Sequence, residues 1–275
     1  MEHRKPLPSP PMAVLAAGVR SLLVATLAAA SLLCARTASA AELIQIPSRS
    51  DVTQGIWLDA PSSTPPWIVI LFAGDNGNVG LASSGPMRMA GNFVLRTASY
   101  WTGLGDAAVI FDTPSDHPDG MDDPFRLSDP ARQDVAAAIS VLRQRYPQAK
   151  IALVGTSRGT ITVGNLLKRS PDIADAFVLT SPVTVARGSQ AGLSGLAWPE
   201  NHARVLVVSN ENDGCMVSPF GNARSLASGN GFAFIAVSSS AGGGSKRAEC
   251  GAHAPHGFLG IEQQVLNDIS GWLQH

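Results

Sequence analysis

The chain has 275 residues, and its 20 Lys and Arg nearly balance its 21 Asp and Glu, for a formal net charge of -1. Charged residues make up only 15% of the chain, which argues against nucleic acid or an anionic membrane as a partner. The hydrophobic content of 45% is that of an ordinary globular protein.

Residues 1–40 are predicted to be a signal peptide and not part of the fold. Basic residues precede an apolar run at 21–33, which is too short to span a bilayer comfortably, and Ala38-Ser39-Ala40 forms an A-x-A cleavage site. Cleavage there would make Ala41 the first mature residue, and Met12 is an alternative start codon to Met1. We therefore expect a periplasmic or secreted protein with no stable membrane insertion after cleavage; the alternative is an uncleaved anchor.

Residues 41–275 are predicted to form one domain, with no repeat or linker dividing it. Apolar runs predict strands at 42–46, 52–58, 67–72, 107–111, 151–154, 176–180, 205–208 and 232–237. Helical patterns occupy 129–144, 160–169, 222–228 and the segment after 260, with Asp129 as an N-cap and Pro130 as the first helical residue. This alternation predicts an α/β fold, a mostly parallel central sheet with helices on both faces.

The pentapeptide Gly155-Thr156-Ser157-Arg158-Gly159 lies between a predicted strand and a predicted helix. A G-x-S-x-G sequence alone is a weak signal, but a strand turning sharply into a helix gives it a chemical meaning. Such a turn holds the Ser157 hydroxyl clear of the sheet, and the flanking glycines let strand and helix cross closely. It also aims the backbone N–H of Arg158 at the space above the hydroxyl.

A serine nucleophile needs a base and an orienting acid, and candidates for both follow Ser157 along the chain. For the acid, Asp213 and Glu211 lie in the loop after the strand at 205–208, and Asp213 is preferred. For the base, His256 and His253 lie before the last helix, and His256 is preferred because Gly257 lets the loop turn inward.

Serine, acid at a strand end, then histidine is the chain order of the α/β-hydrolase triad, and the sequence resembles that superfamily from about residue 42 to the end. The resemblance implies an α/β-hydrolase fold whose first strands are antiparallel. It assigns Ser157 as nucleophile, His256 as base and Asp213 as acid.

The resemblance also implies an oxyanion hole made by the N–H of Arg158 and a second N–H from the loop after residue 72. Asp75, or alternatively Gly74, supplies that second donor. Relatives usually have His-Gly in this loop, so an aspartate is a departure from the family pattern. Its carboxylate would repel an oxyanion unless it points away or pairs, for example with Arg158. The plain alternative is that Asp75 and Asn76 form an Asx-turn.

Cys215 and Cys250 are the two cysteines that remain after cleavage of the leader. In an exported protein such a pair is most simply a disulfide, and here it would join the acid loop to the histidine loop. Two buried free thiols are the alternative.

The connection at 181–203 is too short for a cap domain, so we expect an open site walled by Trp198 and by the segment 74–101. No metal-ligand cluster or dinucleotide fingerprint is present, so neither a metal nor a cofactor is expected. These observations favour an exported serine hydrolase that cleaves a small-molecule carboxylic ester through an acyl-enzyme. A non-catalytic binding relative, and an acyltransferase or peptidase with the same triad, are the alternatives.

Overall fold

The computed structural model describes residue 1 and residues 41–198, 202–245 and 248–275. The chain divides into two units, residues 1–37 and 38–275, and every described helix and strand belongs to the second. The expected signal peptide, apart from Met1, lies outside the described residues.

Eight strands form one sheet in the order β1-β2-β6-β3-β7-β8-β9-β10. Their bounds are Glu42–Arg49 (β1), Val52–Asp59 (β2), Trp67–Phe72 (β3), Ala107–Pro114 (β6), Lys150–Thr156 (β7), Ala176–Thr180 (β8), Val205–Asn210 (β9) and Ala233–Val237 (β10). β1 and β2 pair antiparallel, as do β2 and β6, and the other pairs are parallel. The expected α/β class with antiparallel first strands is therefore confirmed. A separate ribbon pairs β4 (Leu81–Ala82) with β5 (Gly85–Pro86).

The apolar runs become strands because helices cover both faces of the sheet. Every residue of β3, β8 and β9 is buried, which is the pattern of parallel strands with a helix layer on each side. The helices are α1 (Phe93–Arg96), α2 (Ala98–Gly103), α3 (Asp123–Arg126), α4 (Asp129–Arg145), α5 (Gly159–Arg169), α6 (Phe220–Asn230) and α7 (Glu262–Gln274), with short 3-10 turns η1 (Pro171–Ile173) and η2 (Pro255–Gly257).

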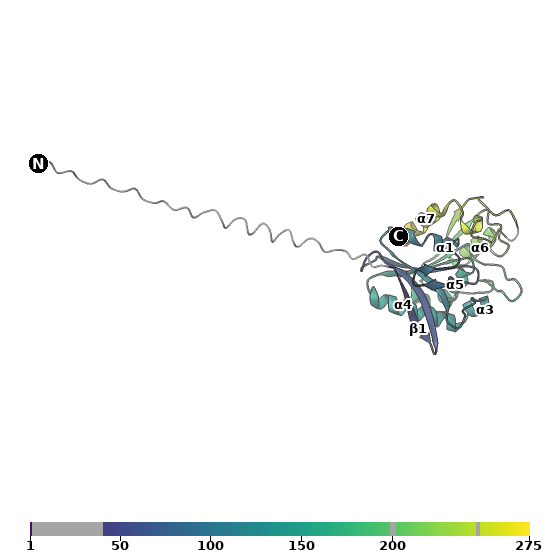
Figure 1. Cartoon of the computed structure of the whole chain (residues 1–275). Helices are drawn as coiled ribbons and strands as arrows, with labels where there is room; N and C mark the ends of the chain where they lie inside the picture. Colours follow the sequence, from purple (N-terminus) through teal and green to yellow (C-terminus); the bar gives the residue numbers. More distant parts are fainter. Residues whose placement is uncertain (2–40, 199–201, 246–247) are drawn as a thin grey trace. The chain divides into compact units, whose positions relative to one another are not determined.

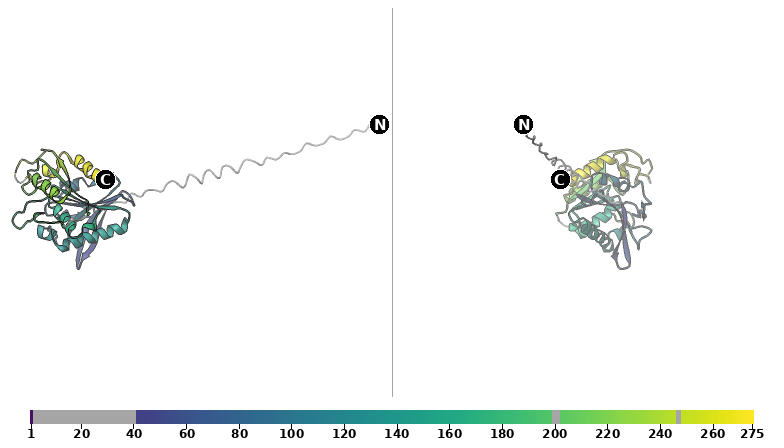
Figure 2. Two further views of the ribbon diagram at one scale, coloured as in Figure 1. Left: turned by 180° about the vertical axis from the view of Figure 1, so that it is seen from behind. Right: turned by 60° about the vertical axis from the view of Figure 1, so that its left-hand side comes forward.

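The two helix layers enclose two hydrophobic clusters. α4, α5 and α6 bury their apolar residues in one cluster, whereas α1, α2 and α7 bury theirs in the other. Figure 1 and Figure 2 show α4 and α7 on opposite sides of the sheet. Within the described part of the chain, no helix combines the length and the apolar character needed to cross a bilayer.

The start of α4 corrects one prediction. Ser128, not Asp129, is the N-cap: its backbone is extended, with ψ 165°, and its side chain accepts the N–H of Ala131. Asp129 is instead the first helical residue, where its negative charge favours the helix N-terminus. The N-cap prediction was wrong by one residue because serine and aspartate, which are adjacent here, are both favoured at the N-cap. The short helices α1, α2 and α3 were not predicted at all.

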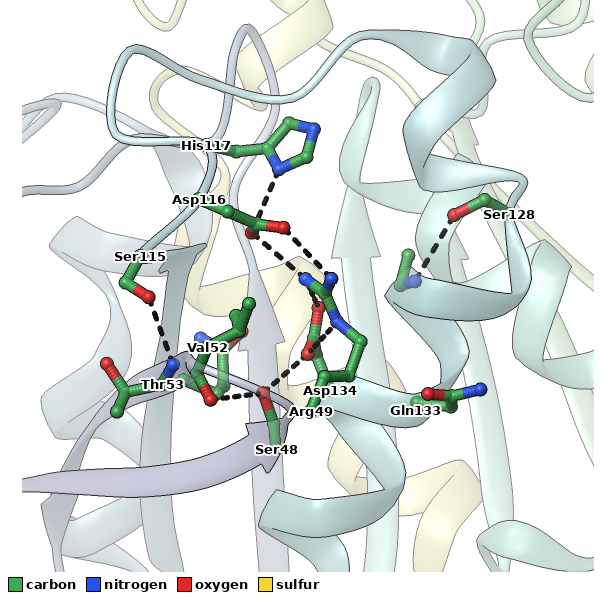
Figure 3. A network of polar contacts seen from close by, with 12 residues as sticks. Ser48, Arg49, Val52, Thr53, Ser115, Asp116, His117, Ser128, Gln133 and Asp134 are labelled. Carbon is green, nitrogen blue, oxygen red and sulfur yellow. Dashed lines mark hydrogen bonds and ion pairs between the residues drawn. The ribbon is translucent and has the colours of Figure 1, made fainter.

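Arg49, at the end of β1, ties the first hairpin to the rest of the sheet (Figure 3). Its guanidinium hydrogen-bonds Asp134 of α4 through Nε, at 2.8 Å, and Asp116 in the loop after β6 through Nη1, at 2.9 Å. Ser48 also donates to Asp134, at 2.6 Å, and His117 contacts Asp116 at 3.0 Å. This network secures the edge hairpin, which also buries Ile46, Ile56 and Leu58 in the core.

The ion pair between Asp116 and Arg49 makes the stability of the fold depend on pH. The Arg49 guanidinium lowers the pKa of Asp116 to about 2 from its ordinary 3.8. A carboxyl whose pKa falls on folding stabilises the folded state above its unfolded pKa and loses that contribution as pH falls toward the folded pKa. We expect Asp116→Asn to be less stable than the parent near neutrality, with the difference shrinking between about pH 4 and pH 2.

Urea unfolding midpoints measured across that pH range test this expectation. Asp119→Asn is the matched control, because the Asp119 side chain is exposed and its hydrogen bond is made by the backbone carbonyl. Parallel curves for the parent and Asp116→Asn would contradict the expectation.

Candidate active site

Ser157 lies in the turn between β7 and α5 with a left-handed backbone, φ 51°. Its N–H donates to the carbonyl of Thr180 at 3.0 Å. A Cβ added to Gly159 would lie 2.1 Å from the carbonyl oxygen of Phe72, and one added to Gly155 would lie 2.6 Å from the carbonyl oxygen of Gly159. Both positions therefore require glycine, and the strained turn that results exposes the serine hydroxyl to a neighbouring cavity.

His256 and Asp213 form a buried pair. Nδ1 of His256 and Oδ2 of Asp213 lie 2.9 Å apart, with side-chain exposures of 4% and 0%. The other carboxylate oxygen of Asp213 accepts the N–H of Cys215 at 2.9 Å, so both oxygens are held. Nε2 of His256 is buried and has no hydrogen-bond partner among the described residues. The pair thus fixes one side of the imidazole and leaves the other available.

The two competing residues are placed elsewhere. His253 is exposed, and its Nε2 would lie 3.1 Å from a Cβ added to Gly91. Glu211 is exposed in the loop after β9, and its side chain makes no hydrogen bond among the described residues. Of the candidates for base and acid, only His256 and Asp213 contact one another.

Ser157 and His256 line the same cavity of about 580 Å³. Its lining residues are Gly74, Asp75, Met89, Gly91, Asn92, Phe93, Thr156, Ser157, Arg158, Cys215, Val217, Cys250, Gly251, Ala252, His256 and Gly257. The segment 74–101 therefore contributes to the wall. Trp198 does not, and that prediction was wrong: its indole N–H donates to the carbonyl of Gly164 at 2.9 Å, which holds the ring against α5.

Gly74 passes very close to the serine. A Cβ at this position would lie 2.9 Å from Cβ of Ser157 and 3.5 Å from its hydroxyl oxygen. Asp75 follows with φ 47°, and the N–H groups of Asp75 and Arg158 donate to no protein acceptor among the described residues. Asp75 and Arg158 both line the cavity that contains the serine, so their N–H groups are candidates to bind an anion formed there.

Of the two ways in which the Asp75 carboxylate could avoid repelling an oxyanion, the pairing with Arg158 does not occur. Arg158 instead hydrogen-bonds Asp123 of α3 through Nε, at 2.9 Å. The Asp75 side chain is exposed, and its carboxylate makes no ion pair within the described residues. Water screens it there, so pairing is not required. The next residue does form the Asx-turn, because Oδ1 of Asn76 accepts the N–H of Asn78 at 3.1 Å.

A buried arginine lies under this loop. Arg126 is 1% exposed, and its Nη2 donates to the carbonyl of Asp75 at 3.2 Å, while Nη1 donates to Oγ1 of Thr162 at 3.1 Å. Burial lowers the pKa of Arg126 to about 10. A Cβ on Gly77 would lie 2.6 Å from Nη2, so the loop wraps closely around the guanidinium.

Sequence reasoning missed two polar residues that support the histidine. Oγ of Ser181 donates to the carbonyl of His256 at 2.7 Å, and Nδ2 of Asn210 donates to the carbonyl of Pro255 at 3.1 Å. Both side chains are fully buried. A signal was present, since each polar residue lies at the carboxyl end of an apolar run, where parallel sheets place their sites.

Cys215 and Cys250 form the expected disulfide. It lines the cavity and joins the loop of Asp213 to the segment that precedes His256. The Cys215 sulfur, a carboxylate oxygen of Asp213 and a ring nitrogen of His256 lie within 4.8 Å of one another. That sulfur is bonded to Cys250, so it is not a free thiolate. The disulfide therefore accounts for the proximity of these three residues.

No protein-family model matches the chain, and no curated protein matches it either. Among solved structures it is similar to a lidless α/β serine hydrolase from Xanthomonas campestris, with 14% identity and a TM-score of 0.55 over 83% of this chain and 94% of that one. The chain has the α/β-hydrolase fold.

Two other solved α/β-hydrolase structures agree. An α/β-hydrolase enzyme from a Medee basin deep-sea metagenome is 18% identical, with a TM-score of 0.55 over 84% of this chain and 95% of that one. An esterase from Pyrococcus furiosus is 12% identical, with a TM-score of 0.56 over 85% and 91%. At such identities the likeness concerns the fold, and activity has to be argued from the cavity.

The disulfide is expected to stabilise the folded domain and both loops. Its cysteines are 35 residues apart, for which the chain-entropy estimate is about 4 kcal/mol. We expect Cys215→Ser with Cys250→Ser to lower the free energy of unfolding by an amount of this order. Urea titration of the parent and the double variant, each with and without reductant, measures the effect. Unchanged stability after complete reduction of the parent would contradict this expectation.

Proposed function

We propose that this protein is an exported serine hydrolase that cleaves a carboxylic ester through an acyl-enzyme. The observation that carries the proposal is the buried His256–Asp213 pair: Nε2 of His256 has no partner among the described residues, and His256 lines the same cavity as the left-handed Ser157. A structural histidine would use both ring nitrogens or expose one to solvent, whereas a base needs one nitrogen oriented and the other unoccupied.

In the proposed reaction, His256 takes the proton of the Ser157 hydroxyl as the oxygen attacks the ester carbonyl. Asp213 holds the imidazole in the required tautomer and stabilises its protonated form. The N–H groups of Arg158 and Asp75 receive the negative oxygen of the tetrahedral intermediate. His256 then protonates the leaving alcohol, and water cleaves the acyl-enzyme by the reverse sequence of proton transfers, which needs no cofactor.

Two further observations support parts of the proposal. The solved structures with the same fold include a serine hydrolase described as lidless and an esterase, both of which the chain covers over most of their length. The disulfide fits a protein exported to an oxidising compartment, as the signal-peptide pattern at 1–40 suggests. The periplasm, or the medium outside the cell, is the proposed location.

The nucleophile can be tested by covalent labelling. A fluorophosphonate probe is expected to label the parent protein and to leave Ser157→Ala unlabelled, because the probe reacts with an activated serine. Ser218→Ala is a suitable control, since Ser218 is buried outside the cavity lining. Labelling retained in Ser157→Ala would remove the catalytic role of Ser157, and no labelling of the parent would favour a binding protein.

The substrate class can be tested with p-nitrophenyl esters of increasing acyl length, beside a peptide p-nitroanilide. A cavity of about 580 Å³ lined by Met89, Phe93 and Val217 is expected to favour short and medium apolar acyl groups. Rates that rise over the first members of the series and then fall would agree with this expectation. Cleavage of the anilide alone would indicate a peptidase, and acyl transfer to an added alcohol in preference to water would indicate an acyltransferase.

A further inference from the structure

The turn that carries His256 is held through its backbone carbonyl groups. Three consecutive carbonyls of η2 each accept a hydrogen bond from a side chain of a different segment. The pairs are Asn210 to Pro255 at 3.1 Å, Ser181 to His256 at 2.7 Å and Arg96 to Gly257 at 2.5 Å. Ser181 directly follows β8, and Asn210 is the last residue of β9, so both lie at the edge of the sheet. Arg96 comes from the helix layer.

The guanidinium of Arg96 also bonds two groups outside this turn. Arg96 is the last residue of α1, and its side chain is 17% exposed. Besides the carbonyl of Gly257, its guanidinium donates to the carbonyl of Gly91 at 2.6 Å and to Oε1 of Glu262 at 2.9 Å. Gly91 and Gly257 both line the cavity. One guanidinium therefore joins two parts of the cavity wall and anchors them to the start of α7.

The residue after this turn gives a reason for such an anchor. Phe258 has a left-handed backbone, φ 57°, which is unfavourable for a bulky side chain. Its ring packs against Phe93 of α1 with ring centroids 4.9 Å apart, and the Arg96 guanidinium lies 5.7 Å from the centroid of Phe93. Packing with α1 and hydrogen bonding to Arg96 thus act together on a strained turn directly beside the histidine.

We propose that Arg96 is a positioning residue for His256. By fixing the carbonyl of Gly257, it sets the orientation of the neighbouring His256 imidazole in the cavity that it shares with Ser157. The planar guanidinium supplies several N–H donors in a fixed geometry, which an ammonium group does not reproduce. This inference rests on the hydrolase function proposed above, because a direction for Nε2 matters only if that nitrogen transfers a proton.

The test compares Arg96→Met and Arg96→Lys with Arg204→Met. Arg204 offers a matched loss, because its guanidinium also donates to a backbone carbonyl, that of Trp272 at 2.6 Å, and lies 4.6 Å from the ring centroid of Trp272. It is not part of the cavity lining. The readouts are kcat and KM with p-nitrophenyl acetate, thermal unfolding, and the downfield NMR signal of the His256 Nδ1 proton bound to Asp213.

Arg96→Met is expected to lower kcat by about 10- to 100-fold, since a small displacement of a catalytic group is enough for such a loss. KM is expected to change less than about threefold, because the lost interaction acts on the transition state. Arg96→Lys is expected to recover little of kcat. In both variants the proton signal should shift or broaden, whereas Arg204→Met should lose thermal stability and keep both kcat and the signal.

A merely structural role for Arg96 predicts the opposite pattern: the unfolding temperature falls, and kcat and the proton signal stay as in the parent. That result in either variant would overturn the proposal. If Arg96→Met does not fold, Arg96→Lys decides alone. The failures of the two proposals are told apart by different measurements. A parent protein that neither hydrolyses esters nor reacts with the fluorophosphonate would end the hydrolase proposal, whereas an unchanged signal in Arg96→Lys would end only this inference.

Discussion

The close crossing of α5 over the end of β3 is the constraint on which the candidate site depends. Gly159 passes so near the carbonyl of Phe72 that no side chain fits between them. With the helix start fixed there, the chain leaving β7 has two residues in which to turn, and Ser157 takes the left-handed backbone that makes the turn possible. The strain is local, but its result is a hydroxyl at the rim of the sheet beside the N-terminus of a helix.

The sheet order explains how distant parts of the sequence meet at this rim. β7, β8 and β9 are neighbours and run parallel, so their carboxyl ends lie side by side. Ser157 follows β7, Ser181 follows β8, and Asn210 ends β9 with Asp213 three residues beyond. The segment with His256 is not part of the sheet, and it reaches this edge through hydrogen bonds from the strand ends. The ends of these strands therefore carry two of the candidate catalytic residues as well as Ser181 and Asn210, which hydrogen-bond the segment of His256.

Much of the fold follows from the sequence because buried parallel strands read as continuous apolar runs. The runs at 67–72 and 176–180 coincide with β3 and β8 to the residue. The candidate triad residues were also named from the sequence, since a G-x-S-x-G turn and polar strand ends carry a local signal. Arg96, Arg126 and Trp198 carried no such signal. Each is placed by contacts with segments far away in sequence, and a residue type alone does not specify those contacts.

Asp75, in the loop proposed to supply the second oxyanion donor, and the nearby Arg126 lie in different surroundings. The carboxylate of Asp75 is exposed, so water screens its field at the neighbouring N–H groups. The guanidinium of Arg126 is buried directly beneath the same loop and bonds the carbonyl of Asp75. A charge acts more strongly through the protein interior than through water. The loop therefore rests on a buried positive charge, while its own carboxylate is exposed to water.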